Sequence, residues 1–221
     1  MKTVLINGSP KVKGSASGTL LEDLKAYLSE TEIVEIGFHA GAVAKETTEI
    51  LNQADALVFA FPLYVDGIPG HLLSCLEELE KTSCKNSSIR VYGIVNCGFY
   101  EGIQAETALQ VLKNWCEKAG YVWGGGVGVG GGGGLAQMPK TKSGHGPREP
   151  IERALKALAE TICMSHVQKD QHQQTAENQY VSVAFPRFLY KLAAQMGWRQ
   201  MMKANGGRAR DLGRRPEESK D

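Results

Sequence analysis

Residues 4–18 read VLINGSPKVKGSASG, and this stretch determines how the rest of the chain is interpreted. A short apolar run ends in a Gly-Ser-Pro turn, and leucines at helical spacing follow at positions 20, 21, 24 and 28. The pattern predicts a buried strand, a loop and a helix. Ser15 or Ser17 can cap that helix, and its first amide groups would converge with the hydroxyl groups of Ser9, Ser15 and Ser17 at the positive end of the helix dipole. The stretch therefore predicts a site for a phosphate monoester.

The spacing of the glycines excludes two better-known phosphate loops. A Walker loop needs a Gly-Lys-Ser/Thr triplet, and no Gly-Lys pair follows Gly8. A dinucleotide fingerprint needs three closely spaced glycines, whereas Gly8, Gly14 and Gly18 lie too far apart for that turn. The simpler alternative is a serine-rich turn that only caps a helix. Three hydroxyl-bearing residues around one strand end favour the phosphate site over that alternative.

The composition is that of a globular protein with one core and an extension: 221 residues, 42% hydrophobic and 22% charged. A formal charge of +1 argues against a strongly acidic electron carrier and against nucleic acid as a partner. The five cysteines, at positions 75, 84, 97, 116 and 163, form no CxxC pair, which indicates a reducing compartment. We find no secretory signal and no apolar run near the roughly 20 residues of a membrane span, so we expect a cytoplasmic protein.

Further apolar runs at 33–36, 56–61, 89–96 and 121–123 alternate with stretches of helical periodicity. Strands that are apolar throughout are typical of a parallel sheet covered on both faces. Five alternations with right-handed crossovers predict a doubly wound α/β fold, a three-layer sandwich with a five-stranded parallel sheet of order 2-1-3-4-5. This order places the loops after the first, third and fourth strands side by side.

Between positions 124 and 134, nine of eleven residues are glycine. Such a run can be a linker, a mobile lid or a loop that lies close against a ligand. Because it follows a predicted strand, we interpret it as a binding loop.

The three adjacent loops resemble those of the flavodoxin-like NAD(P)H-dependent FMN reductase family, also described as NAD(P)H oxidoreductases. The similarity covers about residues 1–163 and rests on GSP at 8–10 with GSAS at 14–17, FPLY at 61–64 with Pro69, and NCGF at 96–99. The resemblance implies that FMN is the cofactor, with its phosphate held by Ser9, Ser15, Ala16 and Ser17. It implies that one side of the isoalloxazine ring is lined by Pro62, Leu63 and Tyr64, and the other side by Asn96, Gly98, Phe99 and Tyr100.

An oxidoreductase is the function that this resemblance implies. NADH or NADPH would supply reducing equivalents, and a small acceptor (a quinone, a flavin, a nitroaromatic or a ferric chelate) would receive them through the flavin. We assign no catalytic residue, because the flavin needs no general acid or base. Tyr64, Tyr100 and Glu101 are candidates for hydrogen bonds to the flavin or acceptor, although solvation at the surface is the more ordinary role for Glu101.

Two other classes of function remain open at this stage. A non-enzymatic electron carrier or redox sensor would also bind FMN, but the balanced charge argues against a carrier that docks through an acidic face. A scaffold that binds no flavin is the third possibility.

Residues 164–221 are expected to form a polar linker, an amphipathic helix at 185–202 and a solvated basic tail with arginines at 208, 210, 214 and 215. The helix can pack on its own domain, on a second subunit or on a membrane surface, and we favour the first two. A homo-oligomer, such as a dimer, is therefore expected. No metal site is expected: His166 and His172 read as linker residues, and the cysteine cluster that related iron–sulfur flavoproteins carry in the region matching 40–65 is missing.

Overall fold

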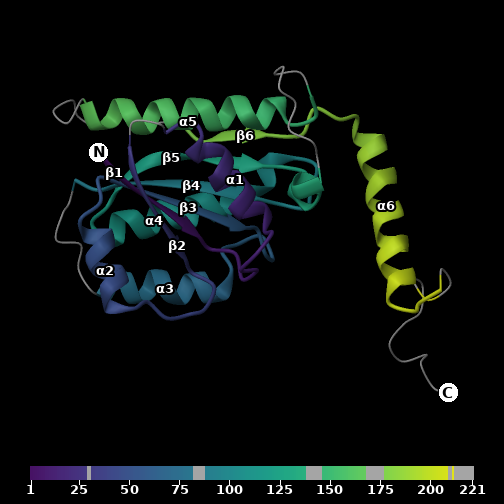
Figure 1. Ribbon diagram of the computed structural model, residues 1–221, viewed down its shortest axis with the longest axis horizontal. Coiled ribbons are helices and arrows are strands. Elements are labelled where there is room, and N and C mark those ends of the chain that lie inside the picture. Colours follow the sequence, from purple (N-terminus) through teal and green to yellow (C-terminus); the bar gives the residue numbers. More distant parts are fainter. Residues whose placement is uncertain (29–30, 82–87, 138–145, 168–176, 209–210, 212–221) are drawn as a thin grey trace. The chain divides into compact units, whose positions relative to one another are not determined.

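The computed structural model describes residues 1–28, 31–81, 88–137, 146–167, 177–208 and 211. The strands form one parallel sheet in the order β2-β1-β3-β4-β5-β6 (Figure 1). Their bounds are β1 (Lys2–Asn7), β2 (Glu32–Gly37), β3 (Ala56–Pro62), β4 (Arg90–Asn96), β5 (Val122–Val129) and β6 (Gln179–Val181). The predicted doubly wound fold and the order 2-1-3-4-5 are confirmed, and the short β6 adds a sixth strand beside β5.

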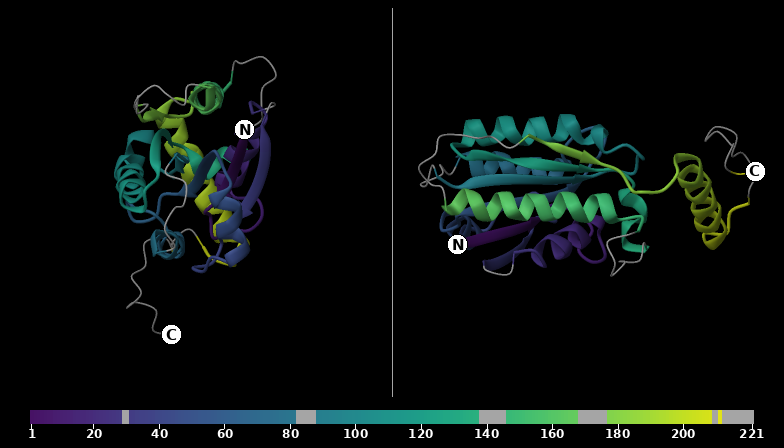
Figure 2. Two further views of the ribbon diagram at one scale, coloured as in Figure 1. Left: turned by 90° about the vertical axis from the view of Figure 1, so that its left-hand side faces the viewer. Right: turned by 90° about the horizontal axis from the view of Figure 1, so that it is seen from above.

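Helices cover both faces of this sheet. They are α1 (Ala16–Lys25), α2 (Lys45–Asn52), α3 (Gly70–Lys81), α4 (Glu106–Ala119) and α5 (Glu149–Val167), with short 3-10 turns η1 (Gly102–Ala105) and η2 (Gly132–Gln137). Figures 1 and 2 show α1 and α5 on one face, and α3 and α4 on the other. Because β1, β3 and β4 are neighbouring parallel strands, their carboxyl ends lie together at one end of the sheet.

The core explains why the apolar runs were informative. All seven positions of β3 are buried, as expected for a strand with helices on both sides. On one face, Phe59 packs edge-on against Trp115 of α4, with ring centroids 5.8 Å apart. The Trp115 indole N–H donates to the Leu76 carbonyl oxygen at 2.8 Å, which ties α4 to α3.

The interpretation of the glycine run as a binding loop is wrong for residues 124–129, because they lie in the buried strand β5. The reason is close packing. A Cβ atom on Gly124 would lie 2.3 Å from the ring of Tyr92, and one on Gly126 would lie 2.7 Å from Leu109 of α4. The glycines leave space for these neighbours, and only the end of the run, near Gly132, reaches the edge of the sheet where the loops gather.

Residues 1–184 form one compact unit, which includes β6, and residues 185–221 form a second. The second unit contains α6 (Arg187–Ala204), which has no buried residue and exposes large apolar side chains, namely Phe188, Leu192, Met196, Trp198 and Met201. Among the described helices, α6 included, none combines the length and the hydrophobicity needed to cross a membrane. Several positions singled out from the sequence lie outside the described residues: Cys84, His172, Arg210, Arg214, Arg215 and the side chain of His166.

Candidate functional site

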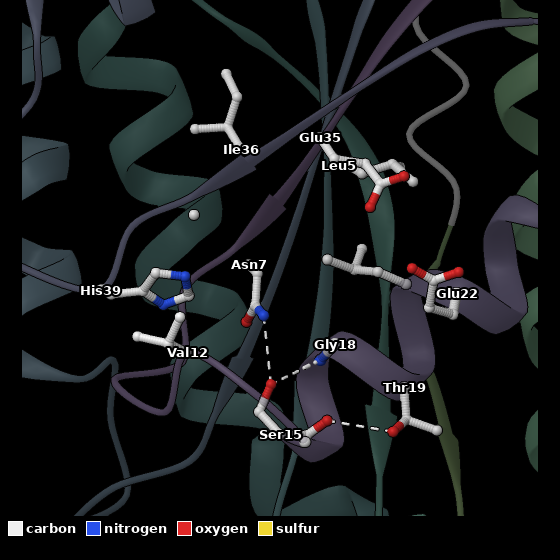
Figure 3. A pocket seen from close by; sticks show the side chains of 13 residues that line it. Leu5, Asn7, Val12, Ser15, Gly18, Thr19, Glu22, Glu35, Ile36 and His39 are labelled. Carbon is white, nitrogen blue, oxygen red and sulfur yellow. Dashed lines mark hydrogen bonds between the residues drawn. The ribbon is translucent and has the colours of Figure 1, made fainter.

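The loop between β1 and α1 is held at both ends by the side chain of Asn7. Its Oδ1 accepts a hydrogen bond from the Ser9 amide at 3.1 Å, and its Nδ2 donates to Ser15 Oγ at 3.3 Å (Figure 3). Asn7 is the last residue of β1, so the rigid strand positions the loop directly. The sequence analysis did not assign it a role, although a polar amide that ends a buried strand is a usable signal.

Ser15 is the N-cap of α1, and its hydroxyl group is oriented by its partners. Its Oγ accepts from the Gly18 amide at 3.0 Å as well as from Asn7. A hydroxyl oxygen has two lone pairs and one proton, so two accepted bonds leave the Ser15 proton as a donor for a ligand. Ser9 is similar, since its Oγ accepts from the Lys11 amide at 3.2 Å and keeps its own proton.

The start of α1 adds further donors. The amides of Ala16 and Ser17 are the first two of the helix and have no partner within it, and they lie at the positive end of the dipole. Together with the two hydroxyl groups they form a donor set suited to an anion. Unlike the hydroxyl groups of Ser9 and Ser15, that of Ser17 has a protein acceptor. Its Oγ donates a buried hydrogen bond to Asn96 Oδ1 at 2.8 Å. This bond ties α1 to the end of β4 and leaves the Ser17 amide, rather than its hydroxyl proton, for an anion.

Two histidines hold the carbonyl groups of the same loop. His39 donates through Nδ1 to the Ser9 carbonyl oxygen at 2.6 Å, and His71 donates through Nε2 to the Gly8 carbonyl oxygen at 3.2 Å. Carbonyl oxygens repel a phosphate, so fixing both of them to imidazole N–H groups favours an anion in the loop. The sequence analysis missed both histidines, because they lie 30 and 63 residues from their partners and meet them only in the folded chain.

A cavity of about 300 Å³ lies at this edge of the sheet. It is lined by nine residues that the sequence analysis selected, namely Ser9, Ser15, Ala16, Ser17, Pro62, Leu63, Tyr64, Asn96 and Gly98. Lys11, Gly14 and Gly132 complete the lining. Lys11 adds a cation beside the donors of the loop; the sequence analysis did not select it, although it follows Ser9 by only two residues. The structure thus brings the loops after β1, β3 and β4 around one space.

Phe99 and Tyr100 were selected as well but do not line this cavity. Phe99 is 55% exposed, and the Tyr100 hydroxyl group donates to the Val183 carbonyl oxygen at 3.5 Å, next to β6. Tyr64 is the aromatic residue on the lining, and it is half exposed. It starts a tight turn in which Val65 and Asp66 have φ values of 49° and 57°, in the left-handed region that strains a β-branched residue.

Cys97 directly follows Asn96, but its chemistry is that of a buried thiol. Burial raises the pKa of Cys97, and burial also raises the pKa of Cys75 and of Cys116. A thiol with a raised pKa stays protonated at neutral pH and is a poor nucleophile. The lining of the cavity instead offers hydroxyl, amide and ammonium donors and apolar surface, which are groups suited to binding and orienting a ligand.

A family model described as NADPH-dependent FMN reductase matches residues 1–117. A comparison with curated proteins found no match. Among solved structures, the apo form of NADH:FMN oxidoreductase (EMOB) has a TM-score of 0.55 at 15% identity, covering 74% of this chain and 89% of that one. The Streptococcus pneumonia TIGR4 flavodoxin has a TM-score of 0.54 at 11% identity, covering 75% and 99%. The NAD(P)H:quinone oxidoreductase from Methanothermobacter marburgensis has a TM-score of 0.51 at 15% identity, covering 80% and 99%. These structural similarities show a shared flavodoxin-like fold.

Proposed function

Because this chain belongs to the NADPH-dependent FMN reductase family, we propose that it binds FMN in the cavity beside the β1–α1 loop and passes reducing equivalents from NADH or NADPH to a small acceptor. The family makes the chain an NAD(P)H-dependent flavin oxidoreductase. The position of the cofactor, the roles of single residues and the kind of acceptor are our proposals.

The donor set of the loop fits the phosphate group of FMN. Ser9 and Ser15 each keep a hydroxyl proton, and the first amides of α1 point outward from the helix end. Lys11 lines the same cavity and would balance part of the dianionic charge. The observation that carries the proposal is the Ser15 hydroxyl group, because its two accepted hydrogen bonds leave only its proton for a ligand.

The other two loops fit the flavin ring. Pro62, Leu63 and Tyr64 offer apolar and aromatic surface on one side, and Asn96 and Gly98 border the other. The Leu63 amide donates to the Asn96 carbonyl oxygen at 2.8 Å, so the two loops are held to each other. FMN, when bound, supplies the hydride and electron chemistry, while these residues bind it, orient it and leave room for a donor and an acceptor.

Anaerobic stopped-flow mixing tests the proposal. The protein is loaded with FMN, the bound flavin is measured by its visible absorbance, and NADH or NADPH is added. We expect one of the two to bleach the flavin within seconds, and a quinone, free flavin, nitroaromatic or ferric chelate to restore the absorbance. A bound flavin that neither pyridine nucleotide bleaches would support the electron carrier or redox sensor instead. A protein that stays colourless after addition of FMN would support the scaffold.

The sequence-based expectations of a homo-oligomer, of a cytoplasmic location and of peripheral contacts through α6 stay part of the proposal. Sedimentation of the full chain and fractionation of cells without detergent are the measurements that test them.

A further inference from the structure

The binding of FMN proposed above makes no use of the helix α6. This helix has 18 residues, none of them buried, and it exposes the five large apolar side chains named with the fold. Most of the stability of such a helix comes from the surface on which its apolar side chains pack. The chemistry of α6 indicates what that surface is.

The charge of α6 has one sign. Its charged residues are Arg187, Lys191, Arg199 and Lys203, and the longer stretch 178–210 has six Lys or Arg residues and no Asp or Glu. The whole chain has a formal charge of only +1, so positive charge is concentrated in this stretch. It is complementary to an anionic lipid surface, where each Lys or Arg strengthens binding by about fivefold.

The arrangement of side chains on α6 favours lipid over a protein partner. The four cations fall within about 160° of the helix circumference, and the opposite side carries no charge and includes Leu189, Met196 and Met201. Phe188 and Trp198 lie between the cations, so the helix has no fully polar side to turn toward water, as a helix packed on protein normally has. At a lipid surface the long stems of Lys and Arg reach the phosphate groups, while aromatic rings lie at the level of the headgroups.

The chain leaves the sheet at the end where the proposed FMN site lies. The strand β6 runs parallel to β5, and its Val181 carbonyl oxygen accepts from the Gly130 amide at 2.8 Å, two residues before the cavity-lining Gly132 (Figure 1). The first compact unit ends at Ala184, and α6 begins three positions later, at Arg187. Three extended residues span at most about 10 Å. A surface-bound α6 therefore keeps the cofactor end of the sheet close to the lipid.

We propose that α6 binds the surface of an anionic membrane and that the acceptor of the enzyme is a long-chain quinone dissolved in that membrane. The choice of acceptor rests on the proposed function, because the reducing equivalents reach the quinone through FMN. One NADH or NADPH and one proton reduce one quinone to its quinol. Free flavins and ferric chelates dissolve in water and gain nothing from a surface-bound enzyme, whereas a long-chain quinone is confined to the bilayer.

Tryptophan fluorescence of the full chain reports on the surface that covers α6. Trp115 and Trp123 are 7% and 5% exposed, whereas Trp198 is 66% exposed. We expect vesicles of equal parts phosphatidylcholine and phosphatidylglycerol to shift the emission to shorter wavelength, and vesicles of phosphatidylcholine alone to have little effect. Trp198→Phe should remove the shift. A shift that grows with protein concentration in the absence of vesicles would show that a second copy covers α6, and would overturn the inference.

Co-sedimentation with the anionic vesicles measures the contribution of charge. Lys191→Gln/Lys203→Gln should weaken vesicle binding by about 10- to 30-fold, because two cations are lost from α6. Lys45→Gln/Lys156→Gln is the matched control, since it removes two exposed lysines from α2 and α5 and changes the net charge equally. The control should bind vesicles as the wild type does. Equal binding by both double variants would contradict the assignment of α6.

The acceptor is tested with FMN-loaded protein and NADH or NADPH. A long-chain quinone is placed in the anionic vesicles, and a short-chain quinone dissolved in water is the comparison. Lys191→Gln/Lys203→Gln should slow reduction of the vesicle quinone by about tenfold or more and leave reduction of the soluble quinone unchanged. A full chain that does not bind the vesicles, or a variant that reduces both quinones as the wild type does, would overturn the inference and leave the proposed function standing. A bound flavin that neither pyridine nucleotide bleaches would overturn the proposed function and the quinone with it, while vesicle binding, measured without nucleotide, would stand.

Discussion

Replacing Ser15 separates phosphate binding from the other roles of the loop. In the structure Ser15 Oγ caps α1 through the Gly18 amide and accepts from Asn7, and its proton is left for a ligand. Ser15→Ala removes a hydrogen bond to a charged group, worth about 1.5–3 kcal/mol. The dissociation constant for FMN should rise by about 10- to 150-fold. Riboflavin lacks the phosphate group, so its weaker binding should change little.

Two further variants make the test sharper. Aspartate is a good N-cap, so Ser15→Asp should keep α1 intact while its carboxylate repels a phosphate dianion. It should therefore abolish FMN binding and retain riboflavin binding. Ser17→Ala is the matched control, because the Ser17 hydroxyl proton is donated to Asn96. Its loss should loosen the loop after β4 and weaken FMN and riboflavin by similar factors.

Fluorescence titration of both flavins against the three variants measures these effects, with urea unfolding as the check on stability. If Ser15→Ala weakened FMN and riboflavin equally, or if Ser15→Asp bound FMN as tightly as the wild type, the loop would be a helix cap only. The placement of the FMN phosphate would then be refuted.

Three predictions concern the scaffold. Arg148→Met should lower the free energy of unfolding by about 3–5 kcal/mol, because it leaves Asp23 as a buried charge without this ion-pair partner. Adding Asp23→Leu should recover most of this loss, and urea unfolding that shows no recovery would contradict the prediction. Gly130→Ala should lower the free energy of unfolding by about 1–3 kcal/mol in the same assay, because the added Cβ atom would lie 2.0 Å from a backbone oxygen. Gly98→Ala is the control and should lower it little, because its Cβ atom would meet no atom within 4 Å. In a variant whose only cysteine is Cys97, iodoacetamide should react far more slowly with the folded than with the unfolded protein, and equal rates would contradict a buried thiol. Because burial raises the pKa of the folded thiol, the free energy of unfolding of this variant should decline as the pH rises above the ordinary thiol pKa.

The parts of the fold that the sequence predicts are those with short-range signals. The apolar run at 4–6, the turn and the leucine spacing of α1 each lie within a few residues, so periodicity detects them. The strand order follows from right-handed crossovers once the alternation is known. Because parallel strands end at a common edge, this topology also predicts that Ser15, Pro62 and Asn96 meet around one space, as the lining of the cavity confirms.

The parts that the sequence did not predict depend on side chains that meet across long separations. Nothing near His39 or His71 in the sequence relates them to the β1–α1 loop, and only β2 and α3 bring them to it. His39 also needs Gly37, because a Cβ atom there would lie 2.2 Å from its ring. Such a requirement depends on the final packing and leaves no periodic trace in the sequence.

The glycine run shows how composition alone can mislead about structure. Glycine indicates permissive backbone, which favours a loop, but the same absence of a side chain lets a buried strand approach its neighbours closely. In β5 those neighbours are Tyr92 and α4, and at the end of the run they belong to the site: a Cβ atom on Gly132 would lie 3.0 Å from the Asn96 Cβ atom. Asn96 in turn accepts the Ser17 hydroxyl proton at the start of α1. The end of the glycine run therefore allows a tight contact with Asn96, and Asn96 in turn fixes the end of β4 to the start of α1.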